Sequence, residues 1–359
     1  MIISRTPYRI SFLGGGTDYP TWYRQRGGCV LAATINKYCY ITVRYLPPFF
    51  EHRIRVVYSK VESCQSLDEI EHPAVREVVR YLDLRRGIEI HHDGDLPARS
   101  GMGSSSAFTV GLLHALYALR GFMPSRQQLA REGIYLEQER LRETVGSQDQ
   151  VMAAHGGFNH VRFQPSGEVE VLPLPLSRSR LDALNSHLML FYTGIKRTAS
   201  NVADTYAHDM DRKEKQLNYL MQLVQEGINV LNSGQDLLQF GRLLHESWQV
   251  KRSLSSSISN QQVGEIYQEA LAAGAIGGKL LGAGGGGFLL LFVHPSNAAR
   301  VREKLSKLIH VPFKFEFVGS QVIFCDREED FAELDEIRSH SAVKFQELTT
   351  LPSVLSKGA

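Results

Sequence analysis

The chain has 359 residues, more than one hydrophobic core normally organises, so two domains are expected. Hydrophobic residues make up 43%, charged residues 22%, and the net charge is only +2, which is typical of a globular protein and argues against a nucleic-acid partner. The longest apolar run, residues 288–293, is too short to span a bilayer, and the N-terminus lacks a secretion pattern. Four cysteines without metal or redox spacing fit a reducing compartment, so we expect a cytoplasmic protein with no membrane partner.

The first ninety residues are predicted to be mainly β-structure. Runs of β-branched and aromatic residues bounded by Gly or Pro are typical of strands, and they occur at residues 9–13, 39–46, 53–59 and 87–97. From Ser104 the apolar residues recur at helical spacing until Gly121 ends the helix. Ser125 and Gln128 form a capping box, which predicts a second helix that extends to about Arg142.

Strands are expected again after this helical region, and a proline-rich stretch at residues 173–180 marks the predicted domain boundary. We therefore predict an N-terminal domain over residues 1–180 and a C-terminal domain over residues 181–359. The second half is expected to begin with a buried strand and to continue with helices over about 200–273. A strand, a glycine-rich loop, a strand, a helix and closing strands should follow.

The stretch LPARSGMGSSSA, residues 96–107, leads from a predicted strand into a helix. Glycines at Gly101 and Gly103 allow backbone N–H groups to converge on an anion, and the helix N-terminus adds positive charge. The hydroxyls of Ser104, Ser105 and Ser106 can bond phosphate oxygens or ligate Mg²⁺, with either Ser104 or Ser105 as the metal ligand. No G-K-[ST] follows, so the loop is not a Walker A motif. A serine-capped helix after a tight turn is the alternative reading.

Two further segments are rich in glycine. Residues 7–19, PYRISFLGGGTDY, end a predicted strand in three glycines, which bring the backbone close to a phosphate, a sugar or the next turn of the chain. Residues 279–288, KLLGAGGGGF, contain Gly284, Gly285 and Gly286. This segment is either a flexible hairpin between buried strands or a loop that approaches a ligand or another loop closely.

Taken together, the three segments resemble the motifs of one family, the GHMP small-molecule kinases, named for galacto-, homoserine, mevalonate and phosphomevalonate kinases. They occur in the family's order and at suitable separations. The resemblance implies an α+β fold of two lobes, with an N-terminal domain like ribosomal protein S5 and a C-terminal ferredoxin-like domain. It also implies ATP-dependent and Mg²⁺-dependent transfer of phosphate to an alcohol, with ATP between the lobes. Adenine contacts are expected from loops between residues 44 and 66.

The predicted helix that starts at Ser125 carries the candidate metal ligand. Glu137 shares one face with Ala130, Ile134 and Leu141, whereas Glu139 lies on the opposite, polar face. A glutamate on an apolar face is costly to bury unless a cation pairs with it, so Glu137 is predicted to bind Mg²⁺. The resemblance agrees, because a helix glutamate precedes the catalytic aspartate of the family by about a dozen residues. A salt-bridged surface glutamate is the alternative.

Asp149 is the candidate catalytic residue. Ser147 and Gln150 can form a capping box, so Asp149 can also be an ordinary acid in a first helical turn. The stretch GSQDQ, however, resembles the segment that holds the catalytic aspartate of galactokinase-like members. That resemblance implies that Asp149 accepts or orients the proton of the acceptor hydroxyl, assisted by Arg9. An edge-strand ion pair is the alternative for Arg9.

The first motif bears on the acceptor. Galactokinases have Gly-Glu-His-Thr-Asp-Tyr where this chain has residues 14–19, so Asp18, which binds sugar hydroxyls in that family, is retained. Gly15 and Gly16 replace the glutamate and histidine, which opens space for a larger or anionic sugar. The predicted substrate site therefore contains Gly15, Gly16, Thr17 and Asp18.

Lys196 and Arg197 follow a predicted buried strand and precede a helix, a position at which basic groups can hold a phosphate. A solvated basic turn is the alternative. The segment resembles the branch of the family that phosphorylates D-glycero-D-manno-heptose 7-phosphate and, more distantly, fucose. We expect phosphorylation of the anomeric (C1) hydroxyl of that heptose phosphate, with L-fucose or another sugar as the second choice. A non-catalytic sensor of ATP and sugar is a remote alternative, and a dinucleotide-binding oxidoreductase is weaker still.

Overall fold

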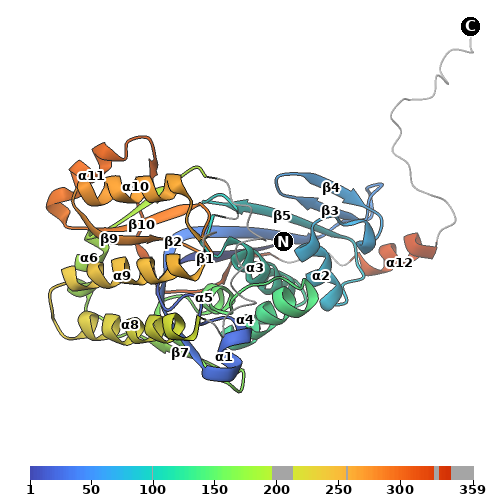
Figure 1. Ribbon diagram of the computed structural model, residues 1–359. Helices are drawn as coiled ribbons and strands as arrows, with labels where there is room; N and C mark the ends of the chain where they lie inside the picture. Colours follow the sequence, from blue (N-terminus) through green and yellow to red (C-terminus); the bar gives the residue numbers. More distant parts are fainter. Residues whose placement is uncertain (99, 196–212, 256–257, 327–330, 341–359) are drawn as a thin grey trace, which may run out of the picture.

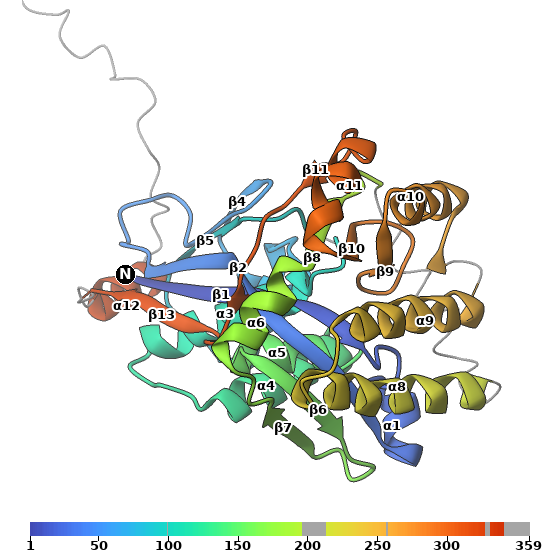
Figure 2. The ribbon, with the colours of Figure 1, turned by 90° about the vertical axis from the view of Figure 1, so that its left-hand side faces the viewer.

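The computed structural model describes residues 1–98, 100–195, 213–255, 258–326 and 331–340. In this part of the chain the strands form two sheets, and helices cover them in two lobes (Figures 1 and 2). The larger sheet has nine strands, with the order β13-β1-β2-β5-β3-β4 and with β6, β7 and β12 joined through β2 and β6. Its strands are β1 (Ile2–Leu13), β2 (Gly28–Tyr45), β3 (Ile54–Val57), β4 (Val61–Cys64), β5 (Ile88–Gly94), β6 (Phe158–Phe163), β7 (Val169–Pro173), β12 (Phe315–Glu316) and β13 (Gln321–Cys325).

The smaller sheet is antiparallel and has the order β11-β8-β10-β9. Its strands are β8 (Leu188–Tyr192), β9 (Ala275–Leu280), β10 (Phe288–Val293) and β11 (Ile309–His310). Every residue of β10 is buried, which explains why its sequence is continuously apolar rather than alternating. The mixed sheet and helix content in two lobes confirms the predicted α+β class.

Helices pack against both sheets. Helix α3 lies on β1 and β2, helix α9 lies on β9, and helix α8 contacts both α9 and β2, so it joins the two lobes. The helices of the first lobe are α1 (Pro20–Arg26), α2 (Pro73–Tyr81), α3 (Ser104–Leu119), α4 (Arg126–Tyr135) and α5 (Gln148–His155). The later helices are α6 (Arg178–Ser186), α8 (Glu214–Asn232), α9 (Leu238–Leu254), α10 (Gln261–Ala272), α11 (Ala298–Lys304) and α12 (Ala332–His340). Short 3₁₀ turns are η1 (Leu67–Glu69) and η5 (Pro295–Asn297).

Two features differ from the sequence-based predictions. The helix expected to run from Ser125 to about Arg142 ends as an α-helix at Tyr135 and continues as a π-helical turn, η2 (Leu136–Arg140). The closing strands also return to the first sheet, since β12 pairs with β2 and β13 pairs with β1. The boundary predicted at residue 180 therefore does not separate the two sheets along the chain, and the domain limits stay a prediction.

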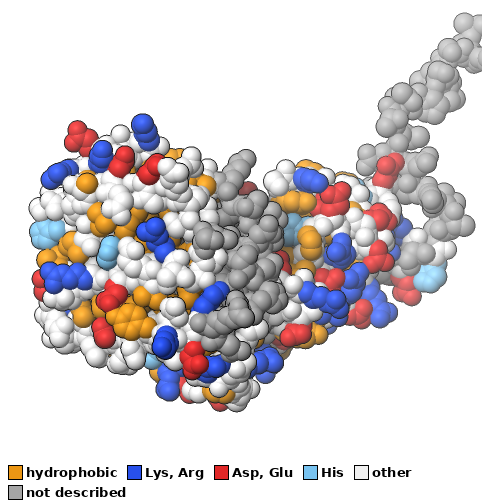
Figure 3. Space-filling model, in the orientation of Figure 1, with side chains coloured by type: hydrophobic (Ala, Val, Ile, Leu, Met, Phe, Trp, Pro, Cys, Tyr) orange, Lys and Arg blue, Asp and Glu red, His pale blue; other side chains and the backbone are white. Residues whose placement is uncertain are grey.

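The face of the molecule shown in Figure 3 has no single dominant charge among its described residues. On the face shown in Figure 3, basic and acidic side chains lie next to one another over both lobes, as the small net charge implies. Among the described helices, none combines the length and the hydropathy that a membrane crossing requires.

Candidate active site

The predicted phosphate loop forms a tight turn in front of α3. Gly101 and Gly103 have φ angles of +87° and +75°, in the left-handed region that favours glycine, and Gly103 is the N-cap residue of α3. Ser104 is half-buried and Ser105 is exposed at the first turn of the helix. The turn therefore presents the N-terminus of a 16-residue helix together with two serines, an arrangement suited to an anion.

Ser106 differs from its predicted role as a phosphate ligand. Its side chain points into the protein, with 3% of the residue exposed, and its hydroxyl donates a hydrogen bond of 2.8 Å to Glu137 Oε2. Helical geometry explains the difference, because the three serines occupy successive positions around the helix and cannot all face the same side.

The third glycine-rich loop packs on the second. The backbone N–H of Phe288 donates to the carbonyl of Ser100, and a Cβ atom on Gly287 would lie 2.1 Å from that same carbonyl oxygen. Cβ atoms on Gly284 and Gly286 would come within 2.6 Å of Ile258 O and 2.4 Å of Ile195 O. In the described structure these glycines therefore allow the backbone of this loop to lie directly against other backbone segments. Of the alternatives that the sequence left open, this geometry favours a loop that approaches another loop closely.

Arg9 and Asp149 form a bidentate ion pair beside the phosphate loop. Arg9 Nε donates to Asp149 Oδ1 at 2.7 Å, and Arg9 Nη2 donates to Asp149 Oδ2 at 2.6 Å. The third guanidinium nitrogen, Nη1, donates to the carbonyl of Gly101 at 2.6 Å. The Asp149 side chain keeps 24% of its surface exposed, whereas the Arg9 side chain keeps 5%. The pair therefore fixes a carboxylate at the edge of the phosphate loop and leaves it accessible.

Glu137 lies in the π-helical turn η2. It is completely buried, and its Oε2 accepts hydrogen bonds from Ser106 and Gln150, which are both neutral. Its Oε1 is buried without a hydrogen-bond partner in the described part of the chain. Burial, aided by the charge of Glu143, raises the pKa of Glu137 to about 8. Glu139 is exposed, which confirms the predicted difference between the two faces.

The environment of Glu137 fits a bound cation. An ionised carboxylate in such a place needs a compensating positive charge, and no basic side chain among the described residues forms an ion pair with it. Mg²⁺ in kinase sites is commonly held by one or two protein oxygens together with substrate phosphates, so a single carboxylate suffices. Ser106, rather than the exposed Ser105, is the serine that contacts Glu137.

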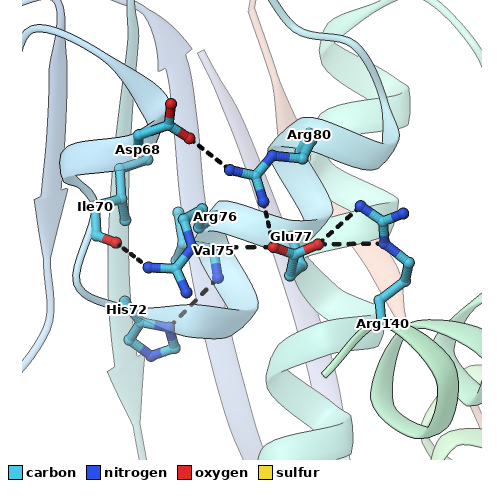
Figure 4. Close-up of polar contacts among 8 residues, drawn as sticks. All are labelled: Asp68, Ile70, His72, Val75, Arg76, Glu77, Arg80 and Arg140. Atoms are coloured by element: carbon cyan, nitrogen blue, oxygen red, sulfur yellow. Dashed lines mark hydrogen bonds and ion pairs between the residues drawn. The ribbon is translucent and has the colours of Figure 1, made fainter. Parts of the chain in front are cut away.

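A salt-bridge cluster fixes the π-helical turn (Figure 4). Glu77 of α2 accepts from Arg140 of η2 at 2.9 Å and also from Arg80, which in turn reaches Asp68. The side chain of Glu77 is only 12% exposed. The cluster therefore connects α2 to the segment that carries Glu137, a π-helical turn of the kind that often occurs at functional sites.

The first motif is held together by its own polar side chains. Asp18 is 1% exposed, and its two oxygens accept from the N–H of Gly16 and from Gln148 Nε2, each at 2.9 Å. Burial raises the pKa of Asp18. Thr17 is fully buried and its hydroxyl lies 2.9 Å from the carbonyls of Gly14 and Cys29, so it stabilises the loop instead of facing a substrate as predicted. Lys196 and Arg197 lie outside the described residues.

Sequence reasoning missed several residues of the site. Gln150 bonds Glu137 instead of capping α5, and the Ser147 side chain makes no cap hydrogen bond. Two lysines of the second lobe also reach this region: Lys279 is buried and donates to the carbonyl of Phe12, and Lys251 donates to the carbonyl of Gly282. Burial lowers the pKa of Lys279 well below its usual value, and the charges of Lys251 and Arg9 lower it further. The sequence-based predictions gave neither lysine a role, although Lys279 is the first residue of the third glycine-rich segment.

An aromatic group stands near the start of α3. The His72 ring is stacked on Phe108 with centroids 4.8 Å apart, Tyr58 meets His72 edge-on at 4.9 Å, and His92 meets Phe108 edge-on at 5.1 Å. Tyr58 belongs to the region from which adenine contacts were expected, but the other three do not. Ring-on-ring packing of this kind is also what a purine base would meet.

Comparison with known proteins agrees with this geometry. The family model of the GHMP kinases N terminal domain matches residues 70–157, and that of the GHMP kinases C terminal matches residues 220–310. A D-glycero-alpha-D-manno-heptose 7-phosphate kinase from Campylobacter jejuni is 29% identical over 317 residues, 85% of this chain and 93% of that protein. An L-fucokinase/L-fucose-1-P guanylyltransferase from Bacteroides fragilis is 27% identical over 86% of this chain, which matches only 36% of that longer protein.

The solved structures give the same grouping. A D-glycero-D-manno-heptose 1-phosphate kinase from Bacteroides thetaiotaomicron superposes with a TM-score of 0.76 at 26% identity, covering 91% of this chain and 100% of that one. A galactokinase from Lactococcus lactis, at 16% identity and a TM-score of 0.71, has the same fold over 89% of this chain and 94% of that one. Both family domains and the two-lobed fold are thus present, and the chain belongs to the GHMP kinases, phosphotransferases that use ATP and act on a hydroxyl group.

Proposed function

We propose that the protein is a Mg²⁺-dependent sugar kinase that transfers the γ-phosphate of ATP to the anomeric hydroxyl of D-glycero-D-manno-heptose 7-phosphate, giving the 1,7-bisphosphate on the way to a nucleotide-activated heptose. The observation that carries the proposal is the Arg9–Asp149 pair at the edge of the phosphate loop. It combines an accessible carboxylate with a fixed guanidinium, next to a helix N-terminus suited to phosphate.

In the proposed reaction Asp149 accepts the proton of the acceptor hydroxyl while that oxygen attacks the γ-phosphorus. The bond between the γ-phosphorus and the bridging oxygen breaks, and ADP leaves. Arg9 holds Asp149 through two hydrogen bonds, so the carboxylate keeps one orientation toward the acceptor. The backbone N–H groups of the loop and of the first turn of α3 bind the phosphates of ATP. Mg²⁺, held by Glu137 with Ser106 nearby, would neutralise charge on those phosphates.

The choice of a heptose phosphate is supported by two relatives, the kinases from Campylobacter jejuni and Bacteroides thetaiotaomicron, whose names both specify a phosphorylated manno-heptose. The two names differ in the position of the phosphate that they specify, 7 in one and 1 in the other. L-fucose is the second candidate acceptor, because the Bacteroides fragilis protein, whose name includes L-fucokinase, matches 86% of this chain.

We assign the adenine ring to the aromatic group of Tyr58, His72 and Phe108.

An ADP-release assay tests the proposal. Purified full-length protein is incubated with Mg²⁺-ATP and a panel that includes the two heptose monophosphates, the neutral heptose, L-fucose, galactose and mevalonate. We expect the highest kcat/KM with D-glycero-D-manno-heptose 7-phosphate, and we expect Arg197→Ala to raise its KM without changing turnover of neutral sugars. A wild-type preference for neutral sugars, with every KM unchanged in Arg197→Ala, would remove the heptose-phosphate assignment. Binding of ATP and sugar without ADP release would instead identify a sensor.

A further inference from the structure

Lys279 is a buried lysine that the proposed reaction does not use. It belongs to β9 and is 2% exposed, and in the described part of the chain its one hydrogen-bond acceptor is the carbonyl of Phe12, at 2.9 Å. Burying a long, basic side chain costs both side-chain entropy and hydration, so its presence calls for a specific role. Because its amino group is enclosed by protein and directed at a backbone oxygen, that role is not contact with a substrate.

Phe12 lies at a β-bulge of β1. Ser11 and Leu13 pair with consecutive residues of β2, so Phe12 has no paired residue in the described sheet. A bulge interrupts the ladder and bends the strand, and bulges are common beside active sites. The carbonyl of this bulged residue is buried and accepts its hydrogen bond from the other lobe. Lys279 therefore fixes β1 at the point where its regular pairing is broken.

The bulge separates the two functional parts of the first motif. Arg9, which holds Asp149, lies before the bulge on β1, and the glycine loop that begins at Gly14 follows it. The direction of the strand at the bulge therefore determines where this loop lies relative to the Arg9–Asp149 pair.

The same stretch of the second lobe also contacts the phosphate loop. Residues 279–282 lead from the end of β9 into the third glycine-rich loop. A Cβ atom on Gly101 of the phosphate loop would lie 2.4 Å from the carbonyl oxygen of Leu281, so the two backbones are in direct contact. One short stretch of chain thus touches the first motif through Lys279 and the phosphate loop through Leu281.

Lys251 of α9 supports this stretch from the helix. Its Nζ donates to the carbonyl of Gly282 at 2.6 Å and lies 4.0 Å from the position of a Cβ atom on Gly15. Lys251 is therefore placed between the third loop and the first motif. Helix α9 packs on β9 in the second lobe (Figure 1), so both lysines reach the first motif from one packed unit.

We propose that Lys279 is a positioning residue that sets the distance between the first motif and the phosphate loop, and that Lys251 assists it by holding the third loop. The inference rests on the proposed function, in which the first motif binds the acceptor and the phosphate loop binds ATP. It goes beyond that function by identifying what aligns the two substrates. Phosphate transfer needs the acceptor oxygen in line with the γ-phosphorus, and a displacement of about 1 Å can slow a reaction about 100-fold.

The test separates positioning from stability. Lys279→Met keeps the apolar stem and removes the donor to Phe12. We expect kcat with the best sugar of the panel to fall about 10- to 100-fold, whereas the calorimetric Kd values for ADP and for the sugar, each measured alone, stay within threefold. ADP release without sugar, in which water is the acceptor, should stay within twofold, because hydrolysis does not depend on the placement of the first motif.

Three further variants complete the comparison. Lys251→Met should lower kcat less than Lys279→Met does, about 3- to 10-fold, the range of one net hydrogen bond. Ser4→Ala removes a side-chain hydrogen bond of the same kind inside the first lobe, to the carbonyl of Gly111 at 2.8 Å, and should lower the melting temperature without changing kcat. Lys304→Met, at an exposed position of α11, should change neither value.

The outcomes separate the two proposals. A wild-type protein that transfers phosphate to no sugar in the panel defeats the proposed function. An active wild-type kinase, with kcat within twofold in folded Lys279→Met, overturns the positioning role alone, and so does an equal fall in phosphate transfer and in hydrolysis by water. If Lys279→Met does not fold, Lys251→Met decides in the same way. Loss of folding in both variants would assign the two lysines to stability and would also overturn the proposal.

Discussion

The π-helical turn that carries Glu137 and the first turn of α5 that carries Asp149 place two carboxylates in opposite electrostatic environments. Glu137 is fully buried and receives hydrogen bonds only from neutral groups, with one oxygen unpaired in the described structure. Asp149 is partly exposed and is already paired with a guanidinium through both oxygens. The two sites are adjacent, because Gln150 bonds Glu137 and directly follows Asp149.

This difference indicates how the work of the site is divided. Asp149 has its counter-charge built into the protein as the guanidinium of Arg9, so its charge is balanced without a metal. Glu137 has no such partner among the described residues, so its ionised form needs a cation from outside, which Mg²⁺-ATP supplies. Both side chains are carboxylates, and their different burial and pairing give them different roles.

The largest effect is expected from Asp149→Asn. The amide keeps the size of the side chain but cannot accept the proton, so kcat should fall by about 10² to 10⁴ with the KM for ATP largely retained. Steady-state ADP release measures both values. Asp182→Asn, at an exposed ion pair with Arg178, is the control and should leave kcat unchanged. Full activity of Asp149→Asn would show that the paired carboxylate is structural.

A smaller effect, on metal use, is expected from Glu137→Gln. The substitution removes the negative charge but keeps both hydrogen-bonding neighbours, so the Mg²⁺ concentration for half-maximal activity should rise about tenfold or more. Glu139→Gln on the exposed face is the matched control and should change it less than twofold. Equal shifts in the two variants would mean that the buried position of Glu137 has no role in metal binding.

The pKa of Glu137 predicts a pH dependence of stability. Because the folded-state pKa is raised from 4.5 to about 8, the folded protein retains a proton that the unfolded chain has lost. The stabilising contribution is therefore complete below pH 4.5 and is lost progressively as the pH rises through about 8, above which it stays constant. In the absence of Mg²⁺-ATP, the melting temperature of wild type relative to Glu137→Gln should fall between pH 5 and pH 9. A constant difference over that range would contradict the environment described for Glu137.

The smallest effect is expected from Glu77→Gln. This change weakens the contact between α2 and the π-helical turn, a partly exposed ion-pair cluster of the kind that contributes about 1 kcal/mol or less. The melting temperature should fall by a few degrees at most, and the effect should shrink at high salt. A shift in Mg²⁺ dependence as large as that of Glu137→Gln would show that Glu77 takes part in the chemistry, beyond holding the turn.

Much of the fold was predictable from local pattern, and the failures have identifiable causes. Helix α3 begins at Ser104 as predicted. Its apolar residues recur at helical spacing and are buried in the structure, and glycines flank the helix at both ends. Helix α2 was missed among the strands, although Pro73 and the buried Val75, Val78 and Val79 follow helical spacing. The return of β12 and β13 to the first sheet could not be predicted, since non-local strand pairing leaves no local signature in the sequence.

The candidate site was predictable where a side chain's role follows from its own element. The helical face singled out Glu137, and the first motif and the GSQDQ segment brought Arg9 and Asp149 together in expectation and in the structure. It was not predictable where the partner comes from another element: Ser106 turns toward Glu137, Thr17 bonds the backbone of Gly14 and Cys29, and Lys251 reaches the first motif from the other lobe. The roles of these residues depend on tertiary packing, which the local sequence pattern does not encode.

The division of work between the two carboxylates can be tested in one measurement, a Mg²⁺ titration of ADP release at fixed ATP and acceptor for wild type, Asp149→Asn and Glu137→Gln. We predict that Asp149→Asn lowers the maximal rate without moving the Mg²⁺ midpoint, whereas Glu137→Gln moves the midpoint to higher Mg²⁺ and recovers part of the rate at saturation. A shifted midpoint in Asp149→Asn together with an unshifted midpoint in Glu137→Gln would contradict the assignment of the metal to Glu137 and of the acceptor proton to Asp149.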